Sequence, residues 1–401
     1  MLKKALFGLF IFALLLFSAA MCEDVTRFAS FSGRKDYSFS NLTDRDYSTP
    51  WKSGSGSKAY LEITLPQNQP CSTVYVQWYG DAMPFRVMVE KDGEWVTLCR
   101  MDEAYYNAAK TLPSPRSRFR ICPAEGDNRS MSICEIRLYS PGPVPDTVQF
   151  WKPAPEKADL MLVSAHPDDE VLWFGGALPT YAGEREMDVV VCLLVPTSAR
   201  RRCEFLDCLW TCGVRTYPVW GSCPDNYSTS LKTQYSYWNE NKLLKLFTSW
   251  YRKYRPDVVL THDIKGEYGH GAHRVCADLC IRALKTAADR EAYPDMASEL
   301  GTWDVPKLYI HLYQENAIEM PWDTPLDFFG GKTGLEVARE GFLCHVSQQK
   351  THYAVNNDGR YSCTRFGLYR SLVGEDVEKN DFFENIIPGY NPFEVVEEED
   401  E

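Results

Sequence analysis

The chain reads Leu160-Met161-Leu162-Val163-Ser164 and then Ala165-His166-Pro167-Asp168-Asp169-Glu170 near its middle. The first part is a short apolar run typical of a buried strand, and the second is a polar loop that follows it directly. Two further apolar runs cover residues 189–195 and 257–260, and helix-like segments cover residues 202–212 and 241–253. Buried strands that alternate with helices predict an α/β domain with a doubly wound, mostly parallel, Rossmann-like sheet.

The first third of the chain has a different pattern, in which apolar and polar residues alternate. The alternating runs cover residues 59–65, 74–78, 85–89, 94–98 and 131–139. Asp92-Gly93 marks a hairpin turn between two of these runs. Short strands separated by turns predict an antiparallel β-sandwich.

Five prolines between Pro141 and Pro155 separate the two patterns and are typical of a linker. We therefore expect a sandwich domain over residues 23–145, a linker over 146–157 and the α/β domain over 158–390. An acidic tail over residues 391–401 is expected to be disordered.

The first residues have the composition of a signal peptide. Lys3 and Lys4 precede an apolar run over residues 5–20, which is short for a membrane span. We expect a signal peptide over residues 1–22, a secreted or cell-surface location, and no membrane span after cleavage. An uncleaved anchor is an alternative, and acylation at Cys22 is a weaker one because bulky Met21 precedes it.

The composition indicates an ordinary globular protein, with 44% hydrophobic residues, 24% charged residues and a net charge of −12. Nucleic-acid binding needs a basic surface, and the run Arg200-Arg201-Arg202 is too short to supply one. Export would permit disulfides among the 14 cysteines. The pairing and the oligomeric state are not determined by the sequence.

The cluster around His166 has the residue types of a metal site. His166 and Asp169 are three residues apart, so they can share one face of a helical turn that opens after the strand. An imidazole and a carboxylate together suit zinc, with ferrous iron as the alternative. Asp168 projects differently and is free to act as a base.

A second cluster follows the strand at residues 257–260. It contains Gly266-Glu267-Tyr268-Gly269-His270 and then His273, at the start of a predicted helix over residues 273–287. One of the two histidines would complete a two-histidine, one-carboxylate site with an open position for water, which is typical of catalytic metal sites. A bound metal would activate this water while Asp168 accepts its proton.

Simpler interpretations compete with this one. Isolated histidine pairs are weak signals, so no metal is assigned to His262, His311, His345 or His352. Tyr268 could serve ordinary loop packing, and Glu204 could pair on a surface helix.

At these residues the chain resembles the PIG-L/LmbE superfamily of metal-dependent N-deacetylases. Residues 165–170 match that family's A-H-P-D-D-E signature letter for letter. Residues 269–274 resemble its G-H-P-D-H-R element, with Gly271 and Ala272 in place of Pro and Asp. The segments 201–204 and 345–348 are similar to further family elements, and the resemblance covers about residues 158–370.

The resemblance implies a role for each residue. It makes His166, Asp169 and His273 the zinc ligands, Asp168 the general base, His270 the acid or oxyanion-stabilising residue, Tyr268 a mobile loop contact and Arg201 a contact for the polar end of the substrate. The departures at Gly271 and Ala272 leave the orientation and pKa of His270 open. Family substrates are N-acetylglucosamine conjugates.

The first domain resembles discoidin-like, galactose-binding-like sandwiches, through Leu42-Thr43-Asp44-Arg45-Asp46 with Trp51. Such domains often hold glycans, sometimes with Ca²⁺ in the early Asp-containing loop. A domain that only covers the catalytic one is the alternative.

Together these features predict an exported zinc hydrolase that removes an N-acyl group, expected to be acetyl, from a glycan or amino-sugar conjugate. The alternatives are a catalytically inactive glycan-binding surface protein and a metal phosphoesterase. The sugar, the linkage and the acyl group are not determined by the sequence.

Overall fold

The protein is described from a computed structural model, which covers residues 21–387 and 389–392. The expected signal peptide, apart from Met21 and Cys22, and nearly all of the acidic tail lie outside these residues. Among the described residues, no helix combines the length and apolar character that crossing a membrane requires.

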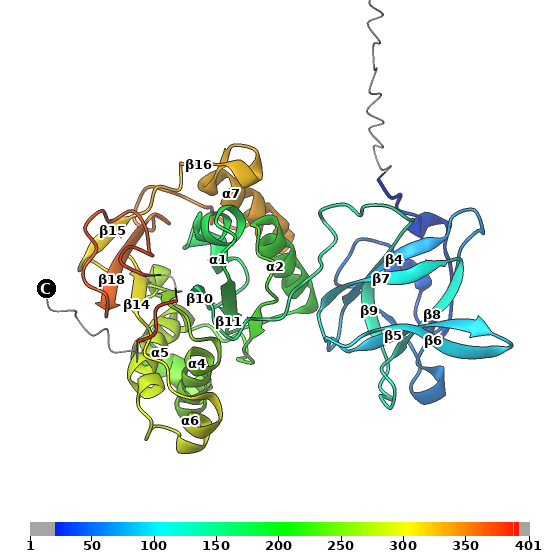
Figure 1. Cartoon of the computed structure of the whole chain (residues 1–401), viewed down its shortest axis with the longest axis horizontal. Coiled ribbons are helices and arrows are strands. Elements are labelled where there is room, and N and C mark those ends of the chain that lie inside the picture. The colour runs from blue at the N-terminus through cyan, green and yellow to red at the C-terminus, as the bar shows by residue number, and fades with distance from the viewer. Residues whose placement is uncertain (1–20, 388, 393–401) are drawn as a thin grey trace, which may run out of the picture.

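The N-terminal domain consists of two antiparallel sheets packed face to face (Figure 1). One sheet has the order β1 (Ser30–Ser32), β3 (Leu61–Thr64), β8 (Arg118–Pro123), β5 (Phe85–Lys91) and β6 (Glu94–Met101). The other has the order β2 (Trp51–Lys52), β9 (Ser132–Tyr139), β4 (Cys71–Trp78) and β7 (Asn107–Arg116). The buried rings of Trp51, Trp78, Phe85 and Phe119 fill the space between the sheets.

Sequence patterning found β3, β4, β5, β6 and β9 but missed the short strands β1 and β2 and the longer β7 and β8. Pro113 and Pro115 lie inside β7, and prolines argue against a strand when the sequence is read alone. β7 is an edge strand that pairs with β4 on one side only. On its open side no strand requires an N–H donor, so prolines are tolerated there.

The C-terminal domain is built on one seven-stranded sheet. Its order is β12 (Val219–Trp220), β11 (Val189–Leu193), β10 (Leu160–Ser164), β13 (Val258–Thr261), β14 (Lys307–His311), β18 (Arg365–Ser371) and β15 (Ala317–Glu319). The first five strands are parallel to one another, β18 runs antiparallel to β14, and β15 runs antiparallel to β18. The domain is therefore α/β with a mostly parallel sheet, as predicted, and the finer Rossmann-like classification remains a prediction.

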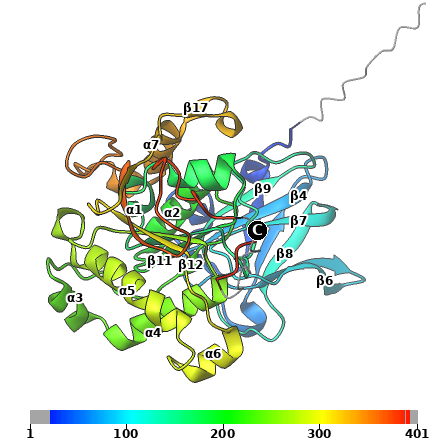
Figure 2. The same ribbon diagram turned by 60° about the vertical axis from the view of Figure 1, so that its left-hand side comes forward.

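Helices lie on both faces of this sheet (Figure 2). Both faces of the sheet are apolar and need a cover, as the short strand β10 illustrates. Leu160 and Leu162 pack into one hydrophobic cluster, and Met161 and Val163 pack into another. The first cluster includes α2 (Ala199–Thr211) and α7 (Gly334–Cys344), and the second includes α4 (Glu240–Tyr254) and α5 (Gly271–Ala288). The remaining helices are α1 (Asp169–Leu172), α3 (Leu231–Tyr237) and α6 (Pro294–Leu300).

The two domains share a buried boundary. The rings of Tyr105 and Tyr217 lie 4.2 Å apart, and the Tyr217 hydroxyl accepts a hydrogen bond from the Tyr106 N–H at 2.8 Å. Arg202 of α2 donates to the carbonyl of Tyr79 at 2.9 Å. The expected linker is packed into this boundary, because Trp151 within it is buried.

All 14 cysteines are free thiols, so none of the disulfides that export would permit is formed. Cys208, Cys212, Cys276 and Cys280 are fully buried, as expected for core packing.

Candidate metal centre

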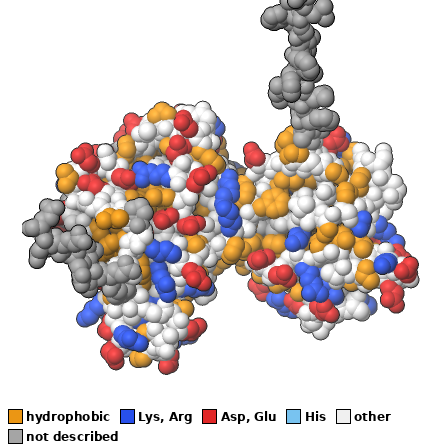
Figure 3. Space-filling view, in the orientation of Figure 1, with side chains coloured by type: hydrophobic (Ala, Val, Ile, Leu, Met, Phe, Trp, Pro, Cys, Tyr) orange, Lys and Arg blue, Asp and Glu red, His pale blue; other side chains and the backbone are white. Residues whose placement is uncertain are grey.

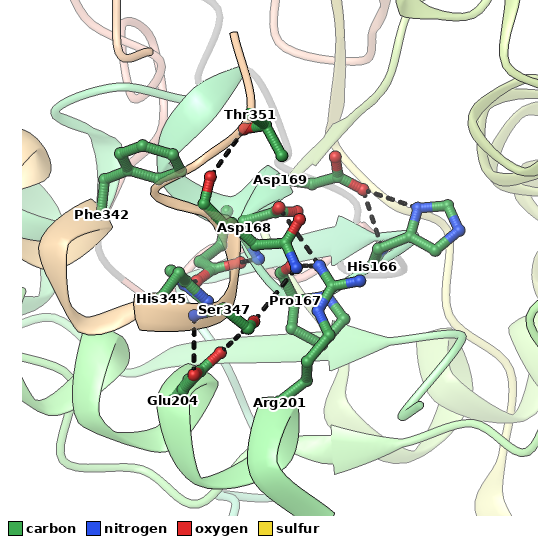
Figure 4. A network of polar contacts seen from close by, with 12 residues as sticks. His166, Pro167, Asp168, Asp169, Arg201, Glu204, Phe342, His345, Ser347 and Thr351 are labelled. Atoms are coloured by element: carbon green, nitrogen blue, oxygen red, sulfur yellow. Dashed lines mark hydrogen bonds and ion pairs between the residues drawn. The ribbon is translucent and has the colours of Figure 1, made fainter. Parts of the chain in front are cut away.

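The loop after β10 orients the first two candidate ligands. The His166 backbone N–H donates to Asp169 Oδ2 at 2.8 Å, and the indole N–H of Trp173 donates to Asp169 Oδ1 at 2.6 Å. The His166 Nδ1 lies 3.3 Å from Asp169 Oδ2 (Figure 4). Because strand β10 ends at the carboxyl edge of the parallel sheet, this loop lies where such folds place their sites.

The loop after the neighbouring strand β13 brings the third candidate ligand. Gly266 has φ 66°, and a Cβ there would lie 2.4 Å from the His270 carbonyl oxygen, so the loop turns tightly only with glycine. His270 then caps α5, and His273 lies in the first turn of that helix. The His273 Nε2 is 3.3 Å from Asp169 Oδ2. Ligand atoms of His166, Asp169 and His273 all lie within 4.8 Å of one another.

Glu267 fixes the orientation of His273, and sequence reasoning gave it no role. Its carboxylate is fully buried and accepts from the Nδ1 of His273 at 2.7 Å, of His262 at 2.9 Å and of His311 at 2.5 Å. These three histidines hold the pKa of Glu267 well below its usual range, against the effect of burial. His262 and His311 are thus buried partners of Glu267 rather than isolated surface histidines.

The donor set fits a divalent cation. Glu267 accepts the Nδ1 proton of His273, so the neutral ring would present the Nε2 lone pair to a cation, and this buried nitrogen has no hydrogen-bond partner. Without a cation, Asp169 and Glu267 raise the pKa of His273 to about 10 against the effect of burial, so a bound cation would displace the proton from Nε2. Two imidazoles and one carboxylate are a ligand set that zinc accepts, with ferrous iron as the alternative. His166, Asp169 and His273 would therefore hold the ion.

Asp168 lies beside this centre in a strained conformation. Its φ of 110° and ψ of −29° are unusual for a residue other than glycine. Its backbone N–H donates to Glu170 Oε2 at 2.7 Å, and the other oxygen of Glu170 accepts from His345 Nε2 at 2.6 Å. The buried Glu170–His345 pair therefore supports the loop conformation that presents Asp168.

The carboxyl of Asp168 has the properties of a base. Burial and the neighbouring charge of Asp169 raise its pKa to about 7, while Arg201 opposes that rise. The Arg201 guanidinium contacts Asp168 Oδ2 at 3.2 Å and donates to the Pro167 carbonyl, reaching up from α2 in Figure 4. Arg201, expected to meet the polar end of a substrate, thus contacts Asp168, the candidate base, as well.

Glu204, expected on a surface helix, is instead buried. It accepts hydrogen bonds from the backbone and the hydroxyl of Ser347 and pairs with Arg200 at 2.9 Å. It therefore ties α2 to the segment that follows α7. Periodicity alone could not separate this glutamate from an exposed one.

The surroundings of His270 determine which protonation form its ring takes. Its Nδ1 accepts a hydrogen bond from the Ala272 N–H at 3.1 Å, so that nitrogen carries no proton. Burial and the nearby His273 and His166 lower the pKa of His270 to about 2. A neutral ring with its proton on Nε2 is therefore the form that the structure favours.

The departure at Gly271 has a structural reason. Its N–H donates to the Ser228 carbonyl at 2.7 Å, and a Cβ there would lie 2.0 Å from the Ser228 hydroxyl. Proline has neither this donor nor this space. The contact holds the segment that places the Tyr227 ring 5.1 Å from the His270 ring.

A cavity of about 140 Å³ opens onto the centre. Its lining includes His166, Asp168, Asp169, Arg201, Tyr268 and His270 from the predicted set, together with Leu172, Trp173, Asp225, Gln348 and Tyr353, which were not predicted. The Tyr268 ring lies 5.2 Å from the Tyr353 ring. Leu172 and Trp173 lie at the end of α1, and Gln348 lies in the segment 345–348 that resembles a family element. Asp225 and Tyr353 come from loops that no motif marks.

The expected calcium site has no comparable geometry. In the early loop of the sandwich, the Asp46 N–H donates to Asp44 Oδ1 and the Ser48 N–H donates to Asp46 Oδ1, both at 2.9 Å. Within residues 21–387 and 389–392, every cluster of three metal-binding side chains lies in the α/β domain. Calcium in the first domain remains an unsupported prediction.

The fold and the site define an α/β protein with a candidate mononuclear cation centre at the carboxyl edge of its sheet. Residues 161–284 match the PIG-L family model, described as GlcNAc-PI de-N-acetylase. That segment contains both loops of the centre. De-N-acetylases are amide hydrolases, which is the class predicted from the sequence.

The similar proteins include two curated deacetylases. One is 1D-myo-inositol 2-acetamido-2-deoxy-alpha-D-glucopyranoside deacetylase 1 of Frankia casuarinae, 28% identical over 42% of this chain and 64% of that protein. The deacetylase of the same name, without the numeral, from Rhodococcus jostii is 28% identical over 57% of this chain and 98% of that protein. The chain thus spans just under two thirds of the Frankia protein.

Two solved structures are each similar to part of the chain. N,N'-diacetylchitobiose deacetylase from Pyrococcus horikoshii is 17% identical, with a TM-score of 0.35, and the match covers 48% of this chain and 71% of that one. An F5/8 type C domain from Bacteroides fragilis is 19% identical, with a TM-score of 0.25, over 30% of this chain and 95% of that one.

Proposed function

We propose that this chain is an exported, zinc-dependent N-deacetylase that acts on N-acetylglucosamine-type glycans or glycoconjugates. The observation that carries the proposal is the convergence of His166, Asp169 and His273 on one point, with Asp168 beside them. The names of the similar proteins support an acetylated amino sugar as the substrate class. Export rests on the sequence of the first 22 residues alone.

Zinc, when bound, would lower the pKa of a water molecule and polarise the amide carbonyl. Asp168 would accept the proton of that water, because its raised pKa matches neutral pH. The same proton can then be delivered to the leaving nitrogen. His270 would donate a hydrogen bond from Nε2 to the developing oxyanion, as a neutral donor rather than a cation.

The surrounding side chains would hold the substrate and exclude water. Tyr268 and Trp173, with ring centroids 6.0 Å apart, form apolar walls suited to an acetyl methyl group or a sugar face. Arg201 would fix the direction of the Asp168 carboxylate while its buried Nε, which has no partner, offers a donor to the substrate.

A catalytically inactive glycan-binding protein is the alternative suggested by Gly271 and Ala272. The contact between Gly271 and Ser228 accounts for the first change by packing, and the candidate ligands and base are all present. These observations favour an enzyme over an inactive relative.

The test is acetate release by the full chain from N-acetylglucosamine and N,N'-diacetylchitobiose, together with metal analysis. We expect one zinc per chain, acetate release, and loss of release after chelation that added zinc restores. Asp168→Asn should abolish release, whereas the exposed control Glu299→Gln should not. Metal-replete protein that releases no acetate from any amino-sugar conjugate would refute the proposal, and two metals per chain would favour a phosphoesterase.

A further inference from the structure

A second cavity, of about 730 Å³, lies between the two domains and away from the metal centre. One wall is the outer face of the sandwich sheet, formed by Tyr75 and Gln77 of β4 and Arg137 of β9. The opposite wall is the C-terminal half of α2, with Asp207 and Trp210. Small-molecule sites have volumes of roughly 300–1,000 Å³ and often lie at domain boundaries.

A chain of hydrogen bonds orients the polar groups of this cavity. The Gln77 amide donates to the Tyr47 hydroxyl at 3.3 Å, and that hydroxyl donates to Asp207 Oδ2 at 2.9 Å. The Gln149 amide donates to Asp207 Oδ1 at 2.6 Å. Both domains and the linker therefore hold Asp207 in one orientation, and the polar groups are fixed before any ligand arrives.

Two buried polar atoms in this cavity have no hydrogen-bond partner. They are the hydroxyl of Tyr75 and the Oε1 of Gln77, on side chains that are 2% and 1% exposed. Tyr75 and Gln77 are two residues apart on β4, so both face the cavity. Buried polar groups are nearly always paired, so these two atoms indicate a missing partner with hydroxyl-like groups.

The lining also suits a ligand without net charge. Asp146 and Asp207 are balanced by Arg137 and Arg215. Arg215 is already engaged, because its guanidinium lies 4.0 Å from the Trp210 ring and donates to the Trp210 carbonyl at 2.8 Å. An anion would meet two carboxylates as well as the two guanidinium groups, and would gain little net attraction.

Aromatic side chains complete the lining, namely Tyr47, Tyr75, Trp210, Phe328 and Phe329. A pyranose ring combines hydroxyl groups with an apolar C–H face, and it therefore needs both aromatic surface and planar polar side chains. In Figure 3, hydrophobic and basic side chains gather along the boundary between the two lobes.

We propose that this interdomain cavity is a second saccharide site, which binds a neutral pyranose unit independently of the metal centre. The site goes beyond the proposed deacetylase activity and does not depend on it. α2 connects the two places, since it carries Arg201 near its first turn and Asp207 and Trp210 near its last. A glycan held at the boundary would therefore lie against the helix that also contacts the catalytic base.

The test is calorimetric titration of the full chain with galactose, N-acetylglucosamine and N,N'-diacetylchitobiose, with glucuronate as the charged comparison. Tyr75→Phe is the informative variant, because it removes a hydroxyl that has no partner and should not impair folding. We expect it to weaken binding of at least one neutral sugar about fivefold to tenfold. Gln77→Ala should weaken binding as well, with thermal melting as the check on folding.

Asp168→Asn separates this site from the metal centre, because binding at the boundary should survive that substitution. The proposal is overturned if no neutral sugar binds, if only glucuronate binds, or if Asp168→Asn weakens binding while Tyr75→Phe and Gln77→Ala do not. Sugar binding at the boundary in a protein that releases no acetate would refute the deacetylase proposal alone. Acetate release without binding at the boundary would refute the saccharide site alone.

Discussion

Replacing Glu267 with glutamine tests how the metal centre is organised. In the structure its carboxylate accepts from three histidine Nδ1 atoms, at 2.5 to 2.9 Å. A glutamine side chain has one acceptor oxygen and one NH₂ donor, so the NH₂ must face at least one of these nitrogens. Where the NH₂ faces His273, that ring must move its proton to Nε2, which removes the lone pair needed by the ion. Where it faces His311 instead, His273 keeps an acceptor but loses the negative charge that makes its Nε2 a strong ligand.

Loss of such a supporting contact typically weakens metal binding by about 10- to 100-fold, which is about 1.4–2.8 kcal/mol. We expect Glu267→Gln to show this loss in a zinc competition titration against a chromogenic chelator. Glu299→Gln, exposed on α6, is the matched control and should bind zinc as the wild type does. Wild-type zinc affinity in Glu267→Gln would show that the ligand geometry does not depend on this carboxylate.

Three further expectations follow from the same structure. His166→Ala should lose both zinc and acetate release, whereas Asp168→Asn should keep zinc and lose about 10²- to 10⁴-fold in kcat; an Asp168→Asn protein without metal would contradict this division of roles. On the acid side of the pH profile, kcat/KM should fall as Asp168 gains a proton. The pKa of Asp168 is about 7 without metal, and a bound cation should lower it. Arg201→Gln should move this acid limb to higher pH because it removes a stabilising charge, and an unmoved limb would exclude Asp168 as the titrating base. Leu162→Ala, at a fully buried position in β10, should cost about 2–5 kcal/mol in chemical denaturation, and a cost below about 1 kcal/mol would contradict the central place of this strand.

The α/β domain could be predicted because its signals are local. Strand β10 is an uninterrupted apolar run, and a cluster of polar residues follows it directly. The His166 and His273 loops were expected to meet because both follow parallel strands, and β10 and β13 are indeed neighbours. The sequence pattern predicts the individual strands, but it does not determine that β10 and β13 are neighbours in the sheet.

The partners of these residues could not be predicted, because they depend on contacts distant in the sequence. Glu170 and His345 are 175 residues apart, and Glu267 and His311 are 44 apart. Single glutamates and histidines carry no periodicity, so their burial is invisible until the chain is folded. The proline-rich linker was misleading for the same reason, since its composition indicates a spacer while Val148, Gln149 and Trp151 within it are buried.

The buried boundary between the domains determines how this protein can be divided in the laboratory. A fragment that begins at the α/β domain would leave Tyr217 without the Tyr105 ring and expose Asp207 without its Tyr47 partner. Such a fragment would expose the face of α2 that carries Asp207 and Trp210, on the same helix whose Arg201 contacts Asp168. Protein prepared for crystallisation or kinetics should therefore keep both domains, and heating should melt them in one cooperative step.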